Sequence, residues 1–432
     1  MIRRDIEKVI NQYVLNVEAL RDFINLIEVF ERNKKQIIKK NPHAYLALLQ
    51  FEIEKDLSLS SIKGDDLKRL KEMKKRISKL CSKKYKIKKE EGSVSLLTSD
   101  YNAYKEIEKT EKDMNLMTIG RKFIIHSTLM NLISVYEKLL VDLIYYINGI
   151  NKEIFISELS NHEITIKDLD GANNVEEIRY NIVSLYINDL LRNDKIEIVD
   201  ILMEKSSLSA EYWNEYKINL IEVKERRNIF VHNDGMVNKE YLDKVDKKLI
   251  KKHKAEIGKR LNTTTDYISD SLDLFEATGV YIAAKIWKKF DNNNTDRSLY
   301  LTSKIIYQRL LENRNFVAEH LAEFVMRDDG SEAIIKDMGQ LNYWLAKKQD
   351  GKYSKIKDDV MKMDYSDKGR KLQLGLLALQ KKKEEFFLLL SDAIKKKDIS
   401  MEQYMEFPIF KDMRRTKASR DFIEKHEKKT KK

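Results

Sequence analysis

Apolar residues recur every three or four positions along most of the chain, which is the spacing of one face of an α-helix. From Ile6 to Phe30 this pattern predicts an amphipathic helix of several turns. Asn41-Pro42 ends the pattern, because the residue before a proline disfavours the helical region. We expect a second helix over about 43–55 and a third, rich in lysine, over about 65–89.

The central part of the chain predicts a helical bundle. Residues 116–150 are apolar nearly all round, which is typical of a helix at the centre of a bundle. A polar connection with few helical signals follows over 149–171. Further helices are expected near 175–192, 195–205, 210–232 and 263–290, and the last of them closes the bundle.

The predicted helices of the C-terminal part differ in length and spacing from those before them. Asp291–Asp296, rich in Asn and Asp, is the clearest linker in the chain. Beyond it the helical stretches are shorter and fairly evenly spaced, and Leu341–Ala346 and Leu374–Leu379 resemble helix pairs of tetratricopeptide repeats. We therefore expect an α-solenoid-like module and, from Lys425, a basic disordered tail. Helices are predicted near 297–312, 314–327, 331–348, 353–363, 367–380, 382–396 and 400–405.

Composition supports an all-α fold class. Only 2 prolines and 13 glycines punctuate the 432 residues, and Leu, Ile, Lys and Glu are abundant. A chain of this length accommodates several domains. The predicted layout is an N-terminal helical domain (1–115), a central helical bundle (116–290), a C-terminal helical-repeat-like domain (297–424) and the basic tail (425–432).

The charge and the single cysteine narrow the class of protein. A net charge of +12 favours a polyanionic partner, although a bias towards AT-rich codons would also enrich lysine, isoleucine and asparagine. Cys81 alone excludes an internal disulfide framework and most zinc sites, which fits a reducing cytoplasm. The chain opens without an apolar signal segment, and no apolar run approaches the roughly 20 residues of a membrane span. We expect a cytoplasmic protein with no membrane partner.

The most informative stretch ends the predicted helix at 210–232. Asn228 and His232 lie one turn apart on one helical face, whereas Arg227 lies roughly 140° around from His232 at about 100° per residue. Either the helix loosens at His232, or two copies of the chain share a site. Asn233-Asp234-Gly235 predicts the helix end, with Gly235 in a left-handed conformation.

Arg227-Asn228, three apolar residues and His232, followed by this turn, resemble the Arg-(four to six)-His motif of the HEPN superfamily. The resemblance covers about residues 116–290. It implies an all-α bundle that dimerises and a metal-independent ribonuclease that needs no cofactor. It also implies that Arg227 and His232 of two protomers meet across a two-fold axis. Asn228 then orients His232 or bonds a phosphate oxygen, and Arg226 is the fallback arginine.

The same resemblance singles out an acidic residue. HEPN domains carry one on an early helix near the active helix, and Glu137 occupies such a position. In that interpretation Glu137 pairs with Arg226 or Arg227 and orients the guanidinium. The alternative is an exposed helix glutamate with no role in the site.

A strongly basic segment follows the motif. Its lysines are expected to hold the RNA backbone, which supplies affinity without reading sequence. The alternative interpretation is a solubilising helix. The candidate RNA-binding residues are Lys247, Lys248, Lys251, Lys252 and Lys254.

Other catalytic signatures are missing from the sequence. It has no Gly-rich phosphate loop followed by Lys-Ser/Thr, no His-Glu-x-x-His and no convincing nucleophile-elbow serine. RNA carries its own nucleophile, the 2′-hydroxyl, so one histidine and one arginine suffice for its cleavage. By resemblance, the products are a 2′,3′-cyclic phosphate or 3′-phosphate and a 5′-hydroxyl.

Three functions compete at this stage. The first is an RNA endonuclease acting on tRNA or mRNA as a toxin or anti-phage abortive-infection effector, with a trigger or inhibitor protein bound by the C-terminal helices. The second is a non-catalytic HEPN-type dimerisation and protein-interaction scaffold. The third is a structural helical protein in which Arg227 pairs with Glu225 or Glu137 and His232 caps a helix. The Arg-Asn…His cluster favours the first.

Overall fold

The computed structural model describes residues 4–430 except 59–64, 82, 91–92, 156–173, 193–196, 209–210, 291–294 and 329–330. In the described part the chain is all-α apart from one two-stranded hairpin, which confirms the predicted fold class. The chain forms two compact units. The smaller comprises Ala19–Met130, and the larger comprises the residues up to Glu18 together with Asn131–Lys432.

This division differs from the predicted domain layout. The expected boundary at 115/116 falls inside one continuous helix, α5 (Tyr101–Ile150), and the division lies at 130/131 instead. The first residues of α1 (Ile6–Asn25) belong to the larger unit, because Tyr13 packs in it and donates a 2.6 Å hydrogen bond to the carbonyl of Phe275. The expected linker at 291–296 lies mostly outside the described residues, and the next helix begins at Thr295.

The smaller unit combines short helices with a hairpin. The break at Asn41-Pro42 is confirmed, since Asn41 leaves the helical region and Pro42 is the first residue of the next helix. A helix was expected to reach residue 89, but it ends at Ser78 and a strand begins at Lys86. The elements are α2 (Ile27–Lys40), α3 (Pro42–Ser58), α4 (Asp65–Ser78), β1 (Lys86–Glu90), β2 (Ser93–Leu97) and the first half of α5.

The hairpin is antiparallel, with Lys86 opposite Leu97 and Glu90 opposite Ser93. Ile87, Val94 and Leu96 are half-buried while their neighbours in the strands are exposed, which is the period-two pattern of a one-sided sheet. Tyr85 beside it is buried with Ala44, Ala47 and Ala103 in the core of this unit. In the sequence, so short an alternation of apolar and polar residues within a lysine-rich stretch is hard to distinguish from a polar helix. The prediction therefore extended the helix over β1.

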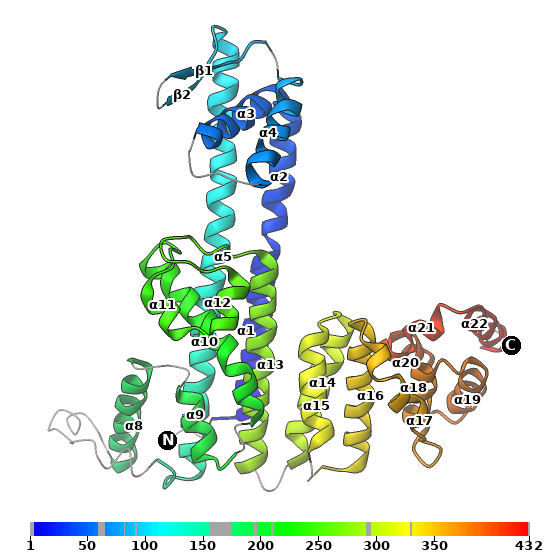
Figure 1. The fold of residues 1–432 in the computed structure, drawn as a ribbon. Helices are drawn as coiled ribbons and strands as arrows, with labels where there is room; N and C mark the ends of the chain where they lie inside the picture. Colours follow the sequence, from blue (N-terminus) through cyan, green and yellow to red (C-terminus); the bar gives the residue numbers. More distant parts are fainter. Residues whose placement is uncertain are drawn as a thin grey trace. The chain divides into compact units, whose positions relative to one another are not determined.

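The larger unit is organised around α13 (Thr265–Phe290), most of whose side chains between Leu274 and Trp287 are buried. The second half of α5 packs on it, with Tyr136 edge-on to Phe275 at 4.9 Å between ring centroids. Figure 1 shows α10 beside α13 and the short helices α11 and α12 packed at the end of α10. The other helices here are α8 (Val175–Arg192), α9 (Glu197–Lys205), α10 (Glu211–His232), α11 (Lys239–Lys244) and α12 (Lys247–His253). The connection expected at 149–171 lies mostly outside the described residues.

The C-terminal helices follow the predicted spacing closely. Helices α14, α15 and α16 pack on one another in succession, and α13 packs on the first two. The expected tail differs: residues 425–430 continue a helix that begins at Lys417. The elements are α14 (Thr295–Leu311), α15 (Asn315–Arg327), α16 (Ala333–Gln349), α17 (Lys357–Lys362), α18 (Arg370–Gln380), α19 (Lys383–Lys395), α20 (Met401–Glu406), α21 (Lys411–Arg414) and α22 (Lys417–Thr430), with 3-10 turns at Tyr353–Lys355 and Pro408–Phe410.

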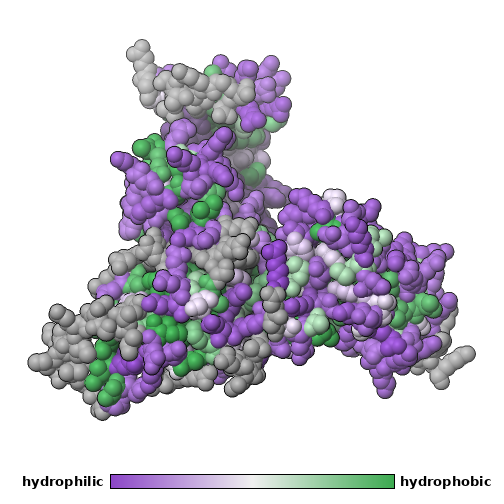
Figure 2. Space-filling model, turned by 60° about the horizontal axis from the view of Figure 1, so that its bottom comes forward, coloured by the Kyte–Doolittle hydropathy of each residue, from purple (hydrophilic) through white to green (hydrophobic). Residues whose placement is uncertain are grey.

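The surface agrees with the charge-rich composition. Charged residues make up 35% of the chain, and the face shown in Figure 2 is mostly hydrophilic, with hydrophobic residues in small groups. Within the described residues, no helix combines the length and the apolar character that crossing a bilayer would demand.

Candidate functional site

The helix that carries the Arg-Asn…His motif is continuous to its predicted end. Helix α10 runs from Glu211 to His232, and the N–H of Asn233 still bonds the carbonyl of Ile229 at 2.9 Å. The helix therefore does not loosen at His232. In a single copy, the backbone positions of Arg227 and His232 stay on different sides of α10.

The turn after His232 has the geometry that the sequence predicts. Gly235 has φ +77°, and Asp234 before it has φ 49°. The N–H of Gly235 bonds the carbonyl of Ile229 at 2.9 Å, which satisfies a carbonyl at the helix end. A Cβ on Gly235 would collide with the ring of Phe230. Glycine is therefore favoured here both by the left-handed backbone conformation and by the lack of room for a side chain beside Phe230.

Beyond the turn, the chain folds back over the end of α10. Val237 N–H bonds the carbonyl of Lys259 at 2.9 Å, and Leu261 N–H bonds the carbonyl of Gly235 at 2.9 Å. Helices α11 and α12 lie in the segment between these two pairings and share a small apolar core with α10. That core consists of Ile229, Val237, Tyr241, Val245, Leu249, Ala255 and Leu261. It fixes the basic segment next to the motif.

Arg227 and Asn228 are held by a short chain of hydrogen bonds. Arg227 Nη1 donates to Asn228 Oδ1 at 3.2 Å, and Asn228 Nδ2 donates to Glu225 Oε2 at 3.3 Å. Glu225 is buried, and Lys224 Nζ lies 3.4 Å from its other oxygen. Asn228 shares a helical face with His232. The hydrogen bond to Asn228 therefore orients the guanidinium of Arg227 towards the side of the helix that carries the histidine.

His232 is exposed in the last turn of α10. Glu240, at the start of α11, accepts a 2.7 Å hydrogen bond from Lys244, which lowers the pKa of Glu240; a smaller electrostatic contribution in the same direction comes from the His232 side chain. Glu240 was not predicted from the sequence as a neighbour of the motif. Its distance of eight residues from His232 crosses the turn, so no helical spacing could have revealed it.

Arg226 has a different environment from its neighbour. It is fully buried, with Nε 2.8 Å and Nη2 2.7 Å from Glu222 Oε1, and Nη1 donates to the carbonyl of Asn262 at 2.9 Å. Its guanidinium lies 3.9 Å from the ring centroid of Tyr267. The fallback arginine is thus enclosed in the bundle, and Arg227 is the arginine of the motif that solvent reaches.

Glu222 is the centre of that buried group. The hydroxyls of Tyr241 and Tyr267 each donate to it at 2.7 Å, from α11 and α13. Burial, followed by the negative charge of Glu222, raises the pKa of Tyr267 well above its ordinary value, so this hydroxyl keeps its proton. Sequence reasoning missed Glu222 and both tyrosines. The only available signal was the four-residue spacing from Glu222 to Arg226.

Glu137 is half-buried on α5. The carboxylate that pairs with Arg226 in the described structure is Glu222 of the same helix, so the expected pairing of Glu137 with that arginine is not the one formed. The physical reason is proximity, since a residue four positions earlier on α10 already faces Arg226.

The predicted RNA-binding lysines are all exposed. Lys247, Lys248, Lys251 and Lys252 are exposed on α12, and Lys254 is exposed at its left-handed C-cap with φ 51°. Among the described residues, no group of three or more His, Cys, Asp or Glu side chains is placed to hold a metal ion.

The chain was compared with family models, curated proteins and solved structures. No family model, no curated protein and no solved structure matches the chain.

Proposed function

We propose that the chain is a metal-independent RNA endonuclease of the HEPN type, with Arg227, Asn228 and His232 in its active site. The observation that supports this most is the hydrogen-bonded pair Arg227–Asn228 one turn before an exposed His232, at the end of a continuous helix. A guanidinium and an imidazole at a solvent-accessible helix end, beside exposed lysines, meet the requirements of RNA cleavage.

The chemistry requires proton transfer and neutralisation of charge. The imidazole of His232 accepts the proton of the 2′-hydroxyl, and the 2′-oxygen forms a bond to phosphorus. The P–O5′ bond breaks, and the 5′-oxygen takes a proton and leaves as a 5′-hydroxyl. Arg227 binds the non-bridging oxygens and stabilises the charge that grows on them. The other product is a 2′,3′-cyclic phosphate, which water opens to a 3′-phosphate.

Two copies of the chain share the site in this proposal. Helix α10 keeps the backbone of Arg227 roughly 140° from that of His232, at about 100° per residue. A two-fold axis near the end of α10 brings the Arg227 of each copy to the His232 of the other, and a dimer then contains two equivalent sites. Dimerisation is part of the proposal.

The exposed lysines of α12 supply the affinity for RNA. Five cations within one short segment contact phosphates along the strand and release counterions on binding. They stand on a helix fixed to α10 by the shared core of Ile229 and Leu249. Binding there holds the strand near His232 without selecting a sequence.

A cytoplasmic toxin or anti-phage abortive-infection effector is the biological role that this activity favours. The C-terminal helices α14–α22 are then the place where a trigger or inhibitor protein binds. Expression in a bacterial host is the simplest indication: the wild-type chain should slow growth, and His232→Ala should relieve the effect.

The direct test uses purified protein and total RNA. We expect the wild type to cut RNA in the presence of EDTA and to leave 5′-hydroxyl ends. His232→Ala and Arg227→Ala should each reduce the rate about 100-fold or more. His43→Ala and Arg32→Ala are matched controls, because both residues are exposed and belong to the smaller unit. Equal activity of His232→Ala and wild type would refute the proposal.

Mixing the two inactive variants tests whether the site is shared. A dimer of one His232→Ala chain and one Arg227→Ala chain contains one site with both residues intact. Random exchange of subunits should therefore restore about a quarter of the wild-type activity. If the mixture stays inactive although subunits exchange, each copy contains its own site. If neither variant was impaired alone, the scaffold function becomes the better explanation.

A further inference from the structure

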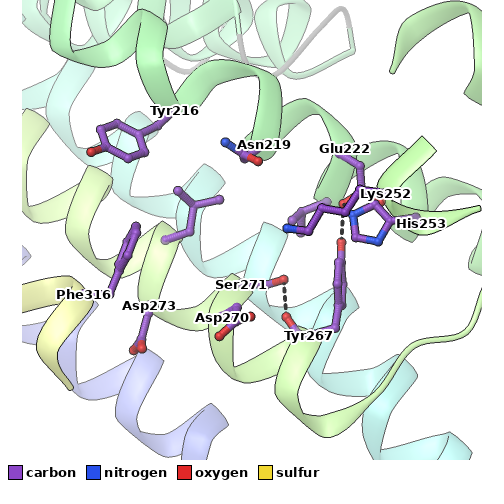
Figure 3. Close-up of a pocket in the computed structure, with 12 residues that line it drawn as sticks. Tyr216, Asn219, Glu222, Lys252, His253, Tyr267, Asp270, Ser271, Asp273 and Phe316 are labelled. Carbon is purple, nitrogen blue, oxygen red and sulfur yellow. Dashed lines mark hydrogen bonds and ion pairs between the residues drawn. The ribbon is translucent and has the colours of Figure 1, made fainter. Parts of the chain in front are cut away.

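Two features of the described chain have no part in the cleavage chemistry proposed above. One is a cavity of about 350 Å³ between α10, α12 and α13 (Figure 3). All of its carboxylates have partners within the chain: Glu222 accepts from Tyr267 and Asp273 from Arg314, and Asp270 is engaged too. These groups therefore belong to the interactions that hold the larger unit together. The other feature is an exposed apolar face of the smaller unit.

On α5 this face is a stripe of large apolar side chains. Leu116, Ile119 and Phe123 are 52%, 63% and 66% exposed. At about 100° per residue they lie within roughly 60° of one another, on one side of the helix. Single exposed apolar residues are ordinary on protein surfaces, whereas a contiguous group of them indicates a contact surface.

Helix α2 runs antiparallel beside this part of α5. A Cβ on Gly120 would lie 2.5 Å from the ring of Phe30, and Arg121 Nε lies 3.9 Å from Glu31 Oε1. These two contacts identify the sides on which the two helices meet. Both helices belong to the smaller unit at this point.

Two exposed apolar residues of the α2 strand of this pair lie on the same side as the α5 stripe. Leu26, just before α2, and Val29 are 45% and 40% exposed, and they precede Phe30 by four and one residues. Leu116 and Ile119 precede the glycine at the contact by the same offsets. In antiparallel helices, equal offsets from the point of contact lead to the same side of the pair. Leu26, Val29, Leu116, Ile119 and Phe123 thus form one surface, the α2–α5 face.

The two ends of the α2–α5 face carry opposite charges. At one end, Lys112 lies one turn before Leu116, and Lys40 ends α2 on the same side. At the other end, Asp22 lies one turn before Leu26. Lys40, Lys112 and Asp22 are all exposed, and none of them forms an ion pair with another described residue. Their charges are therefore available to a partner.

We propose that the α2–α5 face joins two copies of the chain. Two helices that share one apolar side are half of a four-helix bundle, and the same face of a second copy supplies the other half. A two-fold axis perpendicular to the helices brings the lysine end of each copy to Asp22 of the other. An axis parallel to the helices would instead place the lysines of both copies together. The charges therefore select the antiparallel pair, and they make the face complementary to itself.

This interface goes beyond the proposed RNA cleavage and does not depend on it. The shared site proposed at Arg227 and His232 lies in the larger unit, whereas the α2–α5 face lies in the smaller one. Both contacts are isologous, so each can form without the other.

Cysteine cross-linking tests the contact in the full chain. In a background with Cys81→Ser, Ile119→Cys lies near the proposed two-fold axis, and a short bismaleimide should join two copies covalently. Leu80→Cys is the matched control, because Leu80 is also 63% exposed in the smaller unit but lies outside the face. Adding Phe123→Glu to Ile119→Cys should reduce the cross-linked fraction about tenfold or more. Equal cross-linking of Ile119→Cys and Leu80→Cys would overturn the proposal.

Reversal of charges tests the antiparallel arrangement. Lys112→Glu and Asp22→Lys should each weaken self-association about tenfold in sedimentation equilibrium at low salt. The double variant should regain the wild-type affinity to within about twofold. Within one copy the two residues lie at opposite ends of the face, so this rescue reports a contact between copies. Lys35→Glu is the control, because Lys35 is exposed on α2 roughly half a turn around from Leu26.

The outcomes separate this interface from the nuclease site. His232→Ala and Arg227→Ala should cross-link through Ile119→Cys as fully as the parent chain does. A chain that cleaves RNA but is not cross-linked there would refute the α2–α5 contact alone, and would leave the face to a different protein. Cross-linking without cleavage would refute the nuclease alone. A double charge variant as weak as either single one would overturn the antiparallel pair.

Discussion

Arg226 and Arg227 are neighbours in sequence with opposite surroundings. One step along α10 turns the side chain by about 100°, from the buried group around Glu222 to the solvent-accessible side near Asn228. The sequence motif admits either arginine. The choice depends on Tyr241 and Tyr267, which reach Glu222 from other helices, and pairings over such distances leave no local pattern in the sequence.

Replacing each arginine with methionine should separate their roles. Arg226→Met leaves Glu222 buried without its cation, and we expect the free energy of unfolding to fall by about 3–5 kcal/mol. Arg227→Met should change it by less than about 1 kcal/mol, because the side chain is half-exposed. Urea unfolding followed by tryptophan fluorescence measures both, since all three tryptophans belong to the larger unit. A stable Arg226→Met variant that had lost RNA cleavage would instead make Arg226 the catalytic arginine.

At the scale of elements, strong local signals were predicted well and weak ones were not. The end of α10 at His232 and the break at Asn41-Pro42 follow from turn and proline chemistry, and both are confirmed. The hairpin at β1 and β2 was missed, because three half-buried residues among lysines carry little period-two signal. The chemistry of the candidate site was inferred from residue types, whereas Glu240 and Glu222 emerged only from the folded arrangement of α10 and α11.

Gly235 provides a test of how α10 ends. We expect Gly235→Ala to lower the free energy of unfolding through two effects: a left-handed alanine costs about 1–2 kcal/mol, and the new methyl group also collides with Phe230. Gly258→Ala is a matched control with φ +75° and no atom within 4 Å of the added carbon, so it carries the first cost only. Denaturant unfolding of the two variants compares them directly. Equal losses would show that the Phe230 contact is unimportant.

At the scale of the whole molecule, distant segments join in ways that periodicity does not indicate. The start of α1 packs on α13, where a Cβ on Gly279 would lie 2.6 Å from the ring of Tyr13. Glu18, Arg309 and Glu276 form buried or half-buried ion pairs that join α1, α14 and α13. The sequence analysis placed residues 1–115 in one N-terminal helical domain. Tertiary packing instead assigns the start of its first helix to the larger unit.

The contact between α10 and α15 connects the helix of the candidate site to the C-terminal helices. His320 of α15 bonds the hydroxyl of Tyr216 at 2.9 Å and lies 4.2 Å from Phe316 between ring centroids. Burial lowers the pKa of His320 to about 4; the charges of Lys347 and Lys352 act in the same direction, and Glu319 opposes them. The folded chain therefore holds this imidazole neutral at a pH where an unfolded chain would protonate it.

This difference in pKa makes the stability of the larger unit depend on pH. An unfolded histidine takes up its proton near pH 6.5, while His320 in the folded chain does so only near pH 4. The unfolded state thus binds more protons between these values, and stability falls as the pH drops from about 6.5 to 4, by up to about 3 kcal/mol.

His320→Gln removes the titrating group but keeps a hydrogen-bonding side chain opposite Tyr216. We expect the variant to lose about 2 kcal/mol less than the wild type between pH 7.5 and pH 4.5 in urea unfolding. His43→Gln, at an exposed position, should follow the wild type. Parallel pH profiles for His320→Gln and the wild type would mean that the contact between α10 and α15 does not control acid sensitivity.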